Sequence, residues 1–204
     1  MTPPLSRDAA DPEMSFPFIG GRPCLNFVAT LGKRRTSPIE RLPDPAALAR
    51  WISQAQLCAG EDDMRVAAHD LTVARALREA LYRLLLATMG EHAPDPADVQ
   101  RVNEAAARPD LAPQLALPGT QGDEPQTILR WHAAHPVRAA LAGVARDAVL
   151  LVGSPLLARV KECENPGCTL LFLDDSQARR RRWCSMERCG NLAKIAGYRS
   201  RARG

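Results

Sequence analysis

The sequence has few aromatic side chains and no long apolar run, and each absence excludes a class of protein. Phe, Trp and Tyr make up 4% of the 204 residues. The core must therefore be built mainly from Leu, Val and Ala, a composition that favours helices over sheet. The most apolar segment, residues 137–153, contains Arg138, Arg146 and Asp147 and falls short of the roughly 18 apolar residues of a membrane span. Residues 1–15 lack a signal-peptide core, so we expect a cytoplasmic protein.

Groups typical of an active site are also scarce. The chain has four histidines, of which only His132 and His135 lie close together in sequence. No Ser/His/Asp set, phosphate-binding glycine loop or carboxylate pair stands out. We expect these two histidines to be solvated residues of a loop or a helix start, and the protein to have no enzymatic activity.

Positive charge is concentrated at the end of the chain. The net charge is +4, but residues 163–204 hold nine Lys and Arg against four Asp and Glu, a balance of +5. The preceding 162 residues hold eighteen against nineteen, a balance of −1. A basic block of this kind indicates a polyanionic partner, although a solvated tail is an equally simple interpretation.

Capping signals and apolar spacing predict a mainly helical N-terminal part. Asp44 and Asp95 are each followed by proline, which places a carboxylate at the N-cap and Pro45 or Pro96 at the first helical position. Apolar residues at three- or four-residue spacing predict a long helix over residues 64–90, closed by Gly90, and another helix over 136–152.

Short strands complete an α+β prediction. A Gly/Asp-rich turn in residues 112–132 predicts a hairpin, and the apolar run from Cys24 to Leu31 favours a strand. Gly153-Ser154-Pro155 breaks the chain. The expected organisation is a disordered segment over 1–15, a mainly helical domain with a few short strands over 16–154, and a small module over 155–204.

The six cysteines fall into two classes. Cys24 and Cys58 are isolated among apolar residues and are expected to be small buried side chains. The other four form two Cys-x4-Cys pairs separated by fifteen residues, which is the pattern of a structural four-thiolate zinc site. The predicted ligands are Cys163, Cys168, Cys184 and Cys189.

Zinc is a better explanation of this pattern than disulfide bonds, because the sequence carries no secretion signal. Four thiolates leave no coordination position for water, so the zinc ion is expected to be structural and not catalytic. The segment is also too short to fold around a core of its own, and metal ligation supplies the missing stability.

An arginine run lies directly before the second cysteine pair, and a basic helix is expected from Met186 onward. Guanidinium groups suit phosphate, and anchoring them beside a metal reduces the entropy lost on binding. Trp183 is expected to fill the core of the module. The candidate nucleic-acid contacts are Arg179, Arg180, Arg181, Arg182, Arg188, Lys194, Arg199 and Arg201.

Residues 163–191, CENPGCTLLFLDDSQARRRRWCSMERCGN, resemble the CGNR-type zinc finger, a treble-clef-like module. Residues 16–32, FPFIGGRPCLNFVATLG, resemble the start of the ABATE domain, which precedes this finger in bacterial stress-induced transcription regulators. Two departures stand out. Leu192 replaces the usual arginine of the closing motif, and ABATE domains commonly carry an acidic residue and a second asparagine where this chain has Asn26 and Ala29.

These observations lead to a first hypothesis and two alternatives. The first is a DNA-binding transcription regulator whose zinc module presents arginines to the phosphate backbone, while the N-terminal domain dimerises or senses a signal. The alternatives are an RNA- or ribosome-associated zinc protein and a zinc-shaped platform for protein–protein interaction, for which apolar surface around Leu192 and Ile195 would be the signature.

Overall fold

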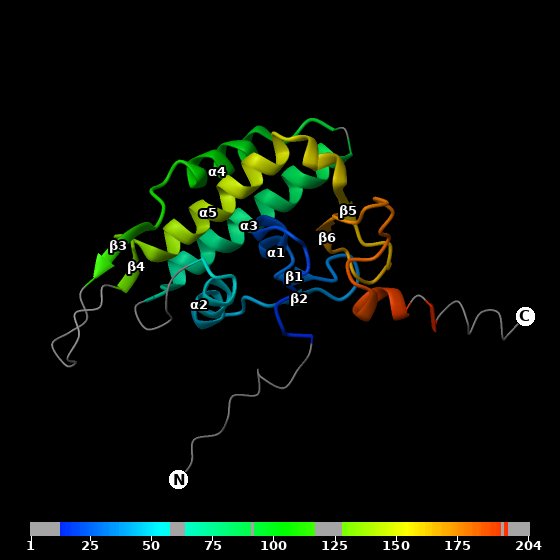
Figure 1. Ribbon diagram of the computed structural model, residues 1–204, viewed down its shortest axis with the longest axis horizontal. Coiled ribbons are helices and arrows are strands. Elements are labelled where there is room, and N and C mark those ends of the chain that lie inside the picture. The colour runs from blue at the N-terminus through cyan, green and yellow to red at the C-terminus, as the bar shows by residue number, and fades with distance from the viewer. Residues whose placement is uncertain (1–12, 58–63, 91, 117–127, 193, 196–204) are drawn as a thin grey trace, which may run out of the picture.

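A layer of three helices forms the body of the molecule (Figure 1). The computed structural model describes residues 13–57, 64–90, 92–116, 128–192 and 194–195. The layer consists of α3 (Ala68–Met89), α4 (Pro96–Ala106) and α5 (Pro136–Val152), and the shorter α2 (Pro45–Gln54) packs beside it. The expected helix over 136–152 is confirmed. The predicted long helix ends before Gly90, as expected, but it begins at Ala68 and not at residue 64.

Both predicted aspartate caps are present. Asp44 accepts a hydrogen bond from the main-chain nitrogen of Ala47 at 2.7 Å, and Asp95 accepts one from that of Ala97 at 2.8 Å. Each carboxylate satisfies an amide that has no partner inside its helix. Local chemistry therefore fixes where α2 and α4 begin.

The expected strand over residues 24–31 is wrong, because this segment forms α1 (Pro23–Val28). Pro23 supplies the fixed backbone angle of a first helical position, and Asp147 of α5 accepts a hydrogen bond from the amide of Cys24 at 3.0 Å. Cys24, Leu25, Phe27 and Val28 are all buried. A largely buried helix has a mainly apolar sequence, which is also the pattern of a buried strand.

Three antiparallel two-stranded pairs complete the α+β fold, which is confirmed. They are β1 (Leu31–Gly32) with β2 (Ile39–Glu40), β3 (Ala112–Ala116) with β4 (Ile128–His132), and β5 (Val160–Glu162) with β6 (Leu171–Leu173). The β3–β4 pair is the predicted hairpin, with Ala112 opposite His132. Its turn, Cys58 and most of residues 1–15 lie outside the described residues, so the expectations for them remain predictions.

Cys24 and His135 lie as the sequence predicted, whereas His132 ends a strand and does not lie in a loop or at a helix start. Cys24 is fully buried, and this burial, together with the charge of Asp147, raises the pKa of its thiol well above the ordinary value. The thiol therefore stays protonated and unreactive. His132 ends β4 and His135 is the N-cap of α5, and both are exposed.

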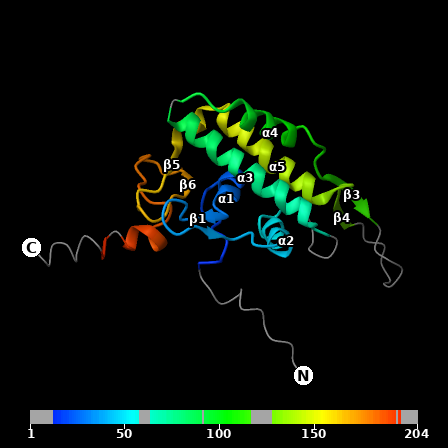
Figure 2. The same cartoon turned by 180° about the vertical axis from the view of Figure 1, so that it is seen from behind.

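Two buried apolar clusters lie side by side. The main cluster is formed by α1, α2, α3, α4 and α5, and it also takes in Val160 and Leu171 from β5 and β6. The second cluster surrounds the paired cysteines and takes in Ala29, which directly follows α1. Figures 1 and 2 show the C-terminal module at one end of the helical layer, beside α1 and β1, and the β3–β4 hairpin at the other end.

Candidate metal centre and basic surface

The four paired cysteines converge on one point. Their sulfur atoms all lie within 4.8 Å of one another, and Cys184 Sγ is 3.7 Å from Cys168 Sγ and 3.6 Å from Cys189 Sγ. A tetrahedral site with Zn–S bonds of about 2.3 Å separates its sulfurs by about 3.8 Å. The arrangement therefore fits a zinc ion held by four thiolates, and the donor set leaves no position for substrate or water.

The backbone brings the two pairs together in a treble-clef-like arrangement. Cys163 directly follows β5 and Cys168 precedes β6, so the first pair lies in the connection of a β-hairpin. Within that connection the side chain of Asn165 accepts a hydrogen bond from the amide of Gly167 at 3.1 Å, which is the turn expected from Asn-Pro-Gly.

The second pair flanks the start of a helix that opens with a wide π-type turn, Met186–Gly190, and the described residues 191–192 and 194–195 are also helical, as expected from Met186 onward. Ser185 caps this turn, accepting hydrogen bonds from the amides of Glu187 at 3.1 Å and Arg188 at 3.3 Å. The amide of Cys184 also points at Cys163 Sγ, 3.5 Å away. An amide aimed at a ligand sulfur stabilises the thiolate form that zinc requires.

The thiols interact strongly with one another. Hydrogen bonds from Cys168 and Cys184 lower the pKa of Cys163 to about 2, and the same contact with Cys163 raises the pKa of Cys168 to about 12. The pKa of Cys184 is raised for the same reason. A thiolate at Cys163 therefore disfavours ionisation of Cys168 and Cys184, and a divalent ion would supply the positive charge that allows these thiols to ionise together.

Asp174 organises the segment between the two pairs. Its carboxylate is fully buried and accepts hydrogen bonds from Lys161 Nζ at 2.6 Å, from the hydroxyl of Ser176 at 2.6 Å and from the amide of Arg181 at 2.9 Å. Burial alone would raise the pKa of Asp174, but these donors lower it below its ordinary value of 3.8. The buried charge is therefore fully compensated.

The consecutive arginines have two different environments: one makes contacts within the module, and others are exposed to solvent. Arg181 stacks on Phe172, with 4.8 Å between its guanidinium carbon and the ring centre, and donates to the carbonyl of Cys184 at 2.8 Å and to Asp175 at 2.7 Å. Arg179 and Arg180 are exposed and form no ion pair with any residue that the structure describes. These two roles could not be told apart from the sequence, in which the four arginines are consecutive.

The remaining basic candidates are arranged around the second pair. Arg182 is exposed, stacks over the half-buried Trp183 at 5.0 Å and pairs with Glu164 at 2.5 Å. Trp183 packs against the cluster around the cysteines, which agrees with the expected core role. Arg188 and Lys194 are exposed. Arg199 and Arg201 lie outside the described residues.

The β1–β2 connection joins the module to the N-terminal helices. The amide of Lys33 donates to the carbonyl of Cys168 at 3.3 Å, and the amide of Arg34 donates to the hydroxyl of Thr169 at 3.1 Å. The guanidinium of Arg34 pairs with Glu79 on α3 at 2.6 Å. Sequence reasoning missed this junction, because nothing in the local pattern of a two-residue strand shows what its loop contacts.

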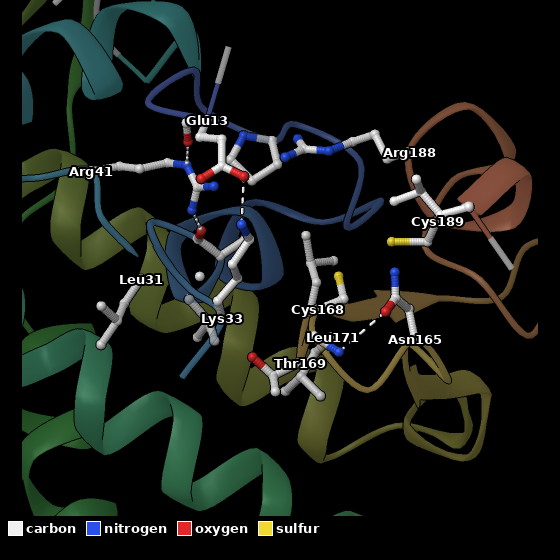
Figure 3. A pocket seen from close by; sticks show the side chains of 17 residues that line it. Glu13, Leu31, Lys33, Arg41, Asn165, Cys168, Thr169, Leu171, Arg188 and Cys189 are labelled. Carbon is white, nitrogen blue, oxygen red and sulfur yellow. Dashed lines mark hydrogen bonds and ion pairs between the residues drawn. The ribbon is translucent and has the colours of Figure 1, made fainter. Parts of the chain in front are cut away.

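A cavity of about 230 Å³ lies at this junction (Figure 3). Its lining includes the zinc-site cysteines Cys168 and Cys189 together with the cations Lys33, Arg41 and Arg188. Arg41 is buried and donates to the carbonyl oxygens of Glu13 at 2.8 Å and Ala29 at 3.2 Å, while Lys33 pairs with the Glu13 side chain. Burial and the nearby charge of Arg188 lower the pKa of Arg41.

These features define a zinc-finger protein with a structural zinc ion and an attached helical domain. The chain belongs to the ABATE family, described as "putative stress-induced transcription regulator", whose model matches residues 21–155, and the CGNR zinc finger model matches residues 159–202. Neither is a family of enzymes, and both agree with the resemblance seen in the sequence. Comparison with curated proteins gives no match. In the described part of the chain, no helix combines the length and the apolar character needed to cross a bilayer.

The two departures from the family pattern lie next to the junction. Asn26 accepts a hydrogen bond from the amide of Gly20 at 2.8 Å and so holds the turn before α1, while Ala29 packs beside the zinc cluster. Leu192 is exposed and lines the junction cavity. The replaced arginine therefore leaves a neutral side chain at the edge of the basic surface.

Proposed function

We propose that this chain is a transcription regulator that binds DNA through its zinc module. One observation carries the proposal: the side chains of Arg179 and Arg180 are exposed, whereas the main chain of this loop is held by hydrogen bonds. Lys161 Nζ donates to the carbonyl of Arg179 at 2.7 Å and to that of Arg181 at 3.3 Å. The same amino group pairs with the buried Asp174.

This anchoring matters for phosphate binding. Arginines on a free tail lose backbone entropy when they bind, whereas arginines on an already ordered loop lose only side-chain freedom. Arg182 is also held over Trp183, and its pairing with Glu164 is exposed to solvent, where such pairs are weak. Phosphate can therefore compete for it at little cost.

The proposed contact set follows from these positions. Arg181 contributes chiefly by bracing the loop, because its guanidinium is committed to Cys184, Asp175 and Phe172. Phosphate contacts are assigned to the exposed basic side chains and to two arginines that follow them in the sequence: Arg179, Arg180, Arg182, Arg188 and Lys194, with Arg199 and Arg201.

The test compares two double variants in the full-length, zinc-loaded protein. The double variant Arg179→Gln, Arg180→Gln should weaken binding to a labelled DNA duplex about tenfold at low salt and reduce the slope of log affinity against log salt by about 2. The control Arg50→Gln, Arg65→Gln removes the same charge from exposed positions of the N-terminal part. Equal losses in both variants, or binding by the wild type that does not depend on salt, would contradict the proposal.

RNA or ribosome association uses the same side chains and is separated by competition. The proposal expects a duplex DNA competitor to displace the labelled duplex at lower concentration than a structured RNA of equal charge. The opposite order would assign the basic surface to RNA.

A protein–protein platform is the second candidate, and one observation favours it. Met186, Leu192 and Ile195 are 50%, 58% and 48% exposed on the C-terminal helical segment of the module. A variant with Leu192→Ser and Ile195→Ser should bind DNA like the wild type; loss of a partner protein without loss of DNA binding would support the platform instead.

The remaining parts of the proposal concern the whole molecule. We infer a cytoplasmic regulator without catalytic activity, whose N-terminal domain forms a homodimer. Sedimentation velocity across a concentration series tests the assembly, and a mass that stays at 22.2 kDa would contradict it.

A further inference from the structure

A second cavity, of about 210 Å³, lies far from the zinc module. It is open to solvent and is lined by α3, α4 and the start of α5, where the N-terminal parts of α3 and α5 meet the C-terminal end of α4, at the end of the layer that carries the β3–β4 hairpin (Figure 1). Its volume is somewhat below the roughly 300–1,000 Å³ of sites for drug-sized molecules. An occupant of this space must therefore be small.

The cavity combines an apolar floor with a basic rim. Leu77 and Leu141 are buried and form the floor together with Val73 and Ala105. Arginines approach from two helices, and Glu104 is the one acidic residue of the lining. The rim arginines are Arg101, Arg108 and Arg138.

The three rim arginines differ from most others in the N-terminal part. They form no ion pair with any residue of the described ranges, and the arginines that do are Arg22, Arg34, Arg35, Arg75, Arg78, Arg83 and Arg146. Glu104 accepts a hydrogen bond from Gln100 at 2.8 Å instead of pairing with the rim. This part of the chain has a net charge of −1, so the local excess of cations does not reflect its overall composition.

Helix electrostatics do not account for these positions. Arg138 is the third residue of α5, where the positive end of the helix dipole disfavours a cation. Arg108 lies just beyond α4, where a cation is favourable, but Arg146 already serves that end by donating to the carbonyl oxygens of Ala106 at 2.9 Å and of Arg108. The charges of Arg138 and Arg108 are thus unexplained by the fold itself.

We propose that this cavity binds a small organic anion with an apolar body, such as an aromatic or short aliphatic carboxylate. The carboxylate would lie among the guanidinium groups of Arg101, Arg108 and Arg138, and the apolar body would cover Leu77 and Leu141. An anion here also faces the positive ends of α3 and α5. The site is separate from the basic surface of the zinc module, so anion binding here does not depend on the DNA-binding proposal.

The test uses benzoate as the probe and benzamide as its neutral counterpart. Titration of the ¹⁵N-labelled full-length protein should shift the amide signals of Ala105 and Arg138 with benzoate, with a dissociation constant of about 1 mM or lower. Benzamide should bind at least tenfold more weakly, because it lacks the charge that guanidinium groups recognise. No shift at these residues with about 20 mM benzoate, or equal affinity for both probes, would overturn the proposal.

Matched variants locate the site. Arg138→Gln should lower benzoate affinity about tenfold, whereas the control Arg50→Gln, on the exposed face of α2, should leave it unchanged. Ala105→Phe fills the cavity without removing a charge and should also abolish binding. Equal losses from Arg138→Gln and Arg50→Gln, or full binding by Ala105→Phe, would place the probe elsewhere and contradict the assignment.

Discussion

Arg34 donates to Glu79 with an Nη1–Oε2 distance of 2.6 Å, and the main chain of the same arginine donates to Thr169 beside the zinc site. Glu79 also accepts from the buried Arg78 at 2.8 Å, which pairs with Glu40 of β2. The Glu79 carboxylate on α3 thus holds the β1–β2 connection, which in turn contacts the zinc module through Thr169. Burial would raise its pKa, but the hydrogen bonds and charges of Arg34 and Arg78 lower it below 4.5.

Glu79→Gln should therefore lower the free energy of unfolding by about 1–2 kcal/mol at pH 7. Because the pKa of Glu79 is depressed in the folded state, its contribution is present above the unfolded value of about 4.3 and is lost as the pH falls through the folded value. Urea unfolding should show the wild type and the variant converging toward pH 3. The exposed Glu164→Gln should change stability by less than about 0.5 kcal/mol, and a difference that grows in acid would contradict the assignment.

Asp174→Asn should weaken zinc binding about tenfold, because it removes the charge that fixes Lys161 and the loop before Cys184. Competition with a chromophoric chelator at pH 7 measures this. Asp175→Asn is the matched control, since its carboxylate is 75% exposed and holds only Arg181. If both variants bind zinc equally well, Asp174 has no role in shaping the metal site.

Cys184→Ser should reduce the zinc content from one ion per chain and disorder the cluster around Phe172, while the helices of the N-terminal part persist. Elemental analysis and circular dichroism in the near and far ultraviolet separate these effects. Cys24→Ala is the control: it should cost about 1–2 kcal/mol of stability through a buried cavity and retain the metal. Full zinc occupancy in Cys184→Ser would remove this residue from the ligand set.

Leu192→Arg restores the residue usual in the closing motif and should raise DNA affinity several-fold, with the salt slope increasing by about 1. Leu192→Gln, which is polar without charge, should not. Fluorescence anisotropy at two salt concentrations is sufficient, and equal affinity for both variants would show that this position does not approach phosphate.

Features written in a few neighbouring residues could be predicted from the sequence. The caps at Asp44 and Asp95 depend on one side chain and the adjoining backbone. In α3 and α5, apolar residues recur every three or four positions because each helix buries one face. The zinc site was predictable for a related reason. Its two cysteine pairs are short local units, and the metal itself specifies how they combine.

Features that depend on distant partners could not be predicted. Residues 24–28 are helical, and Asp147, more than a hundred residues away, accepts a hydrogen bond from the first turn of this helix. Likewise, Arg181 differs from its neighbours because Phe172 lies beneath it and Cys184 faces it. The four arginines are identical in the sequence, and only the fold shows that Arg181 makes its contacts within the module.

Leu171 is buried in the main apolar cluster although it lies only three positions after Cys168. If the chain were cut near residue 155, the N-terminal fragment would have a cavity where Leu171 packs, and the C-terminal fragment would expose Leu171 to solvent. We therefore expect the zinc finger to need the surface of α1 for its full stability, and a fusion of the finger to an unrelated protein should include α1.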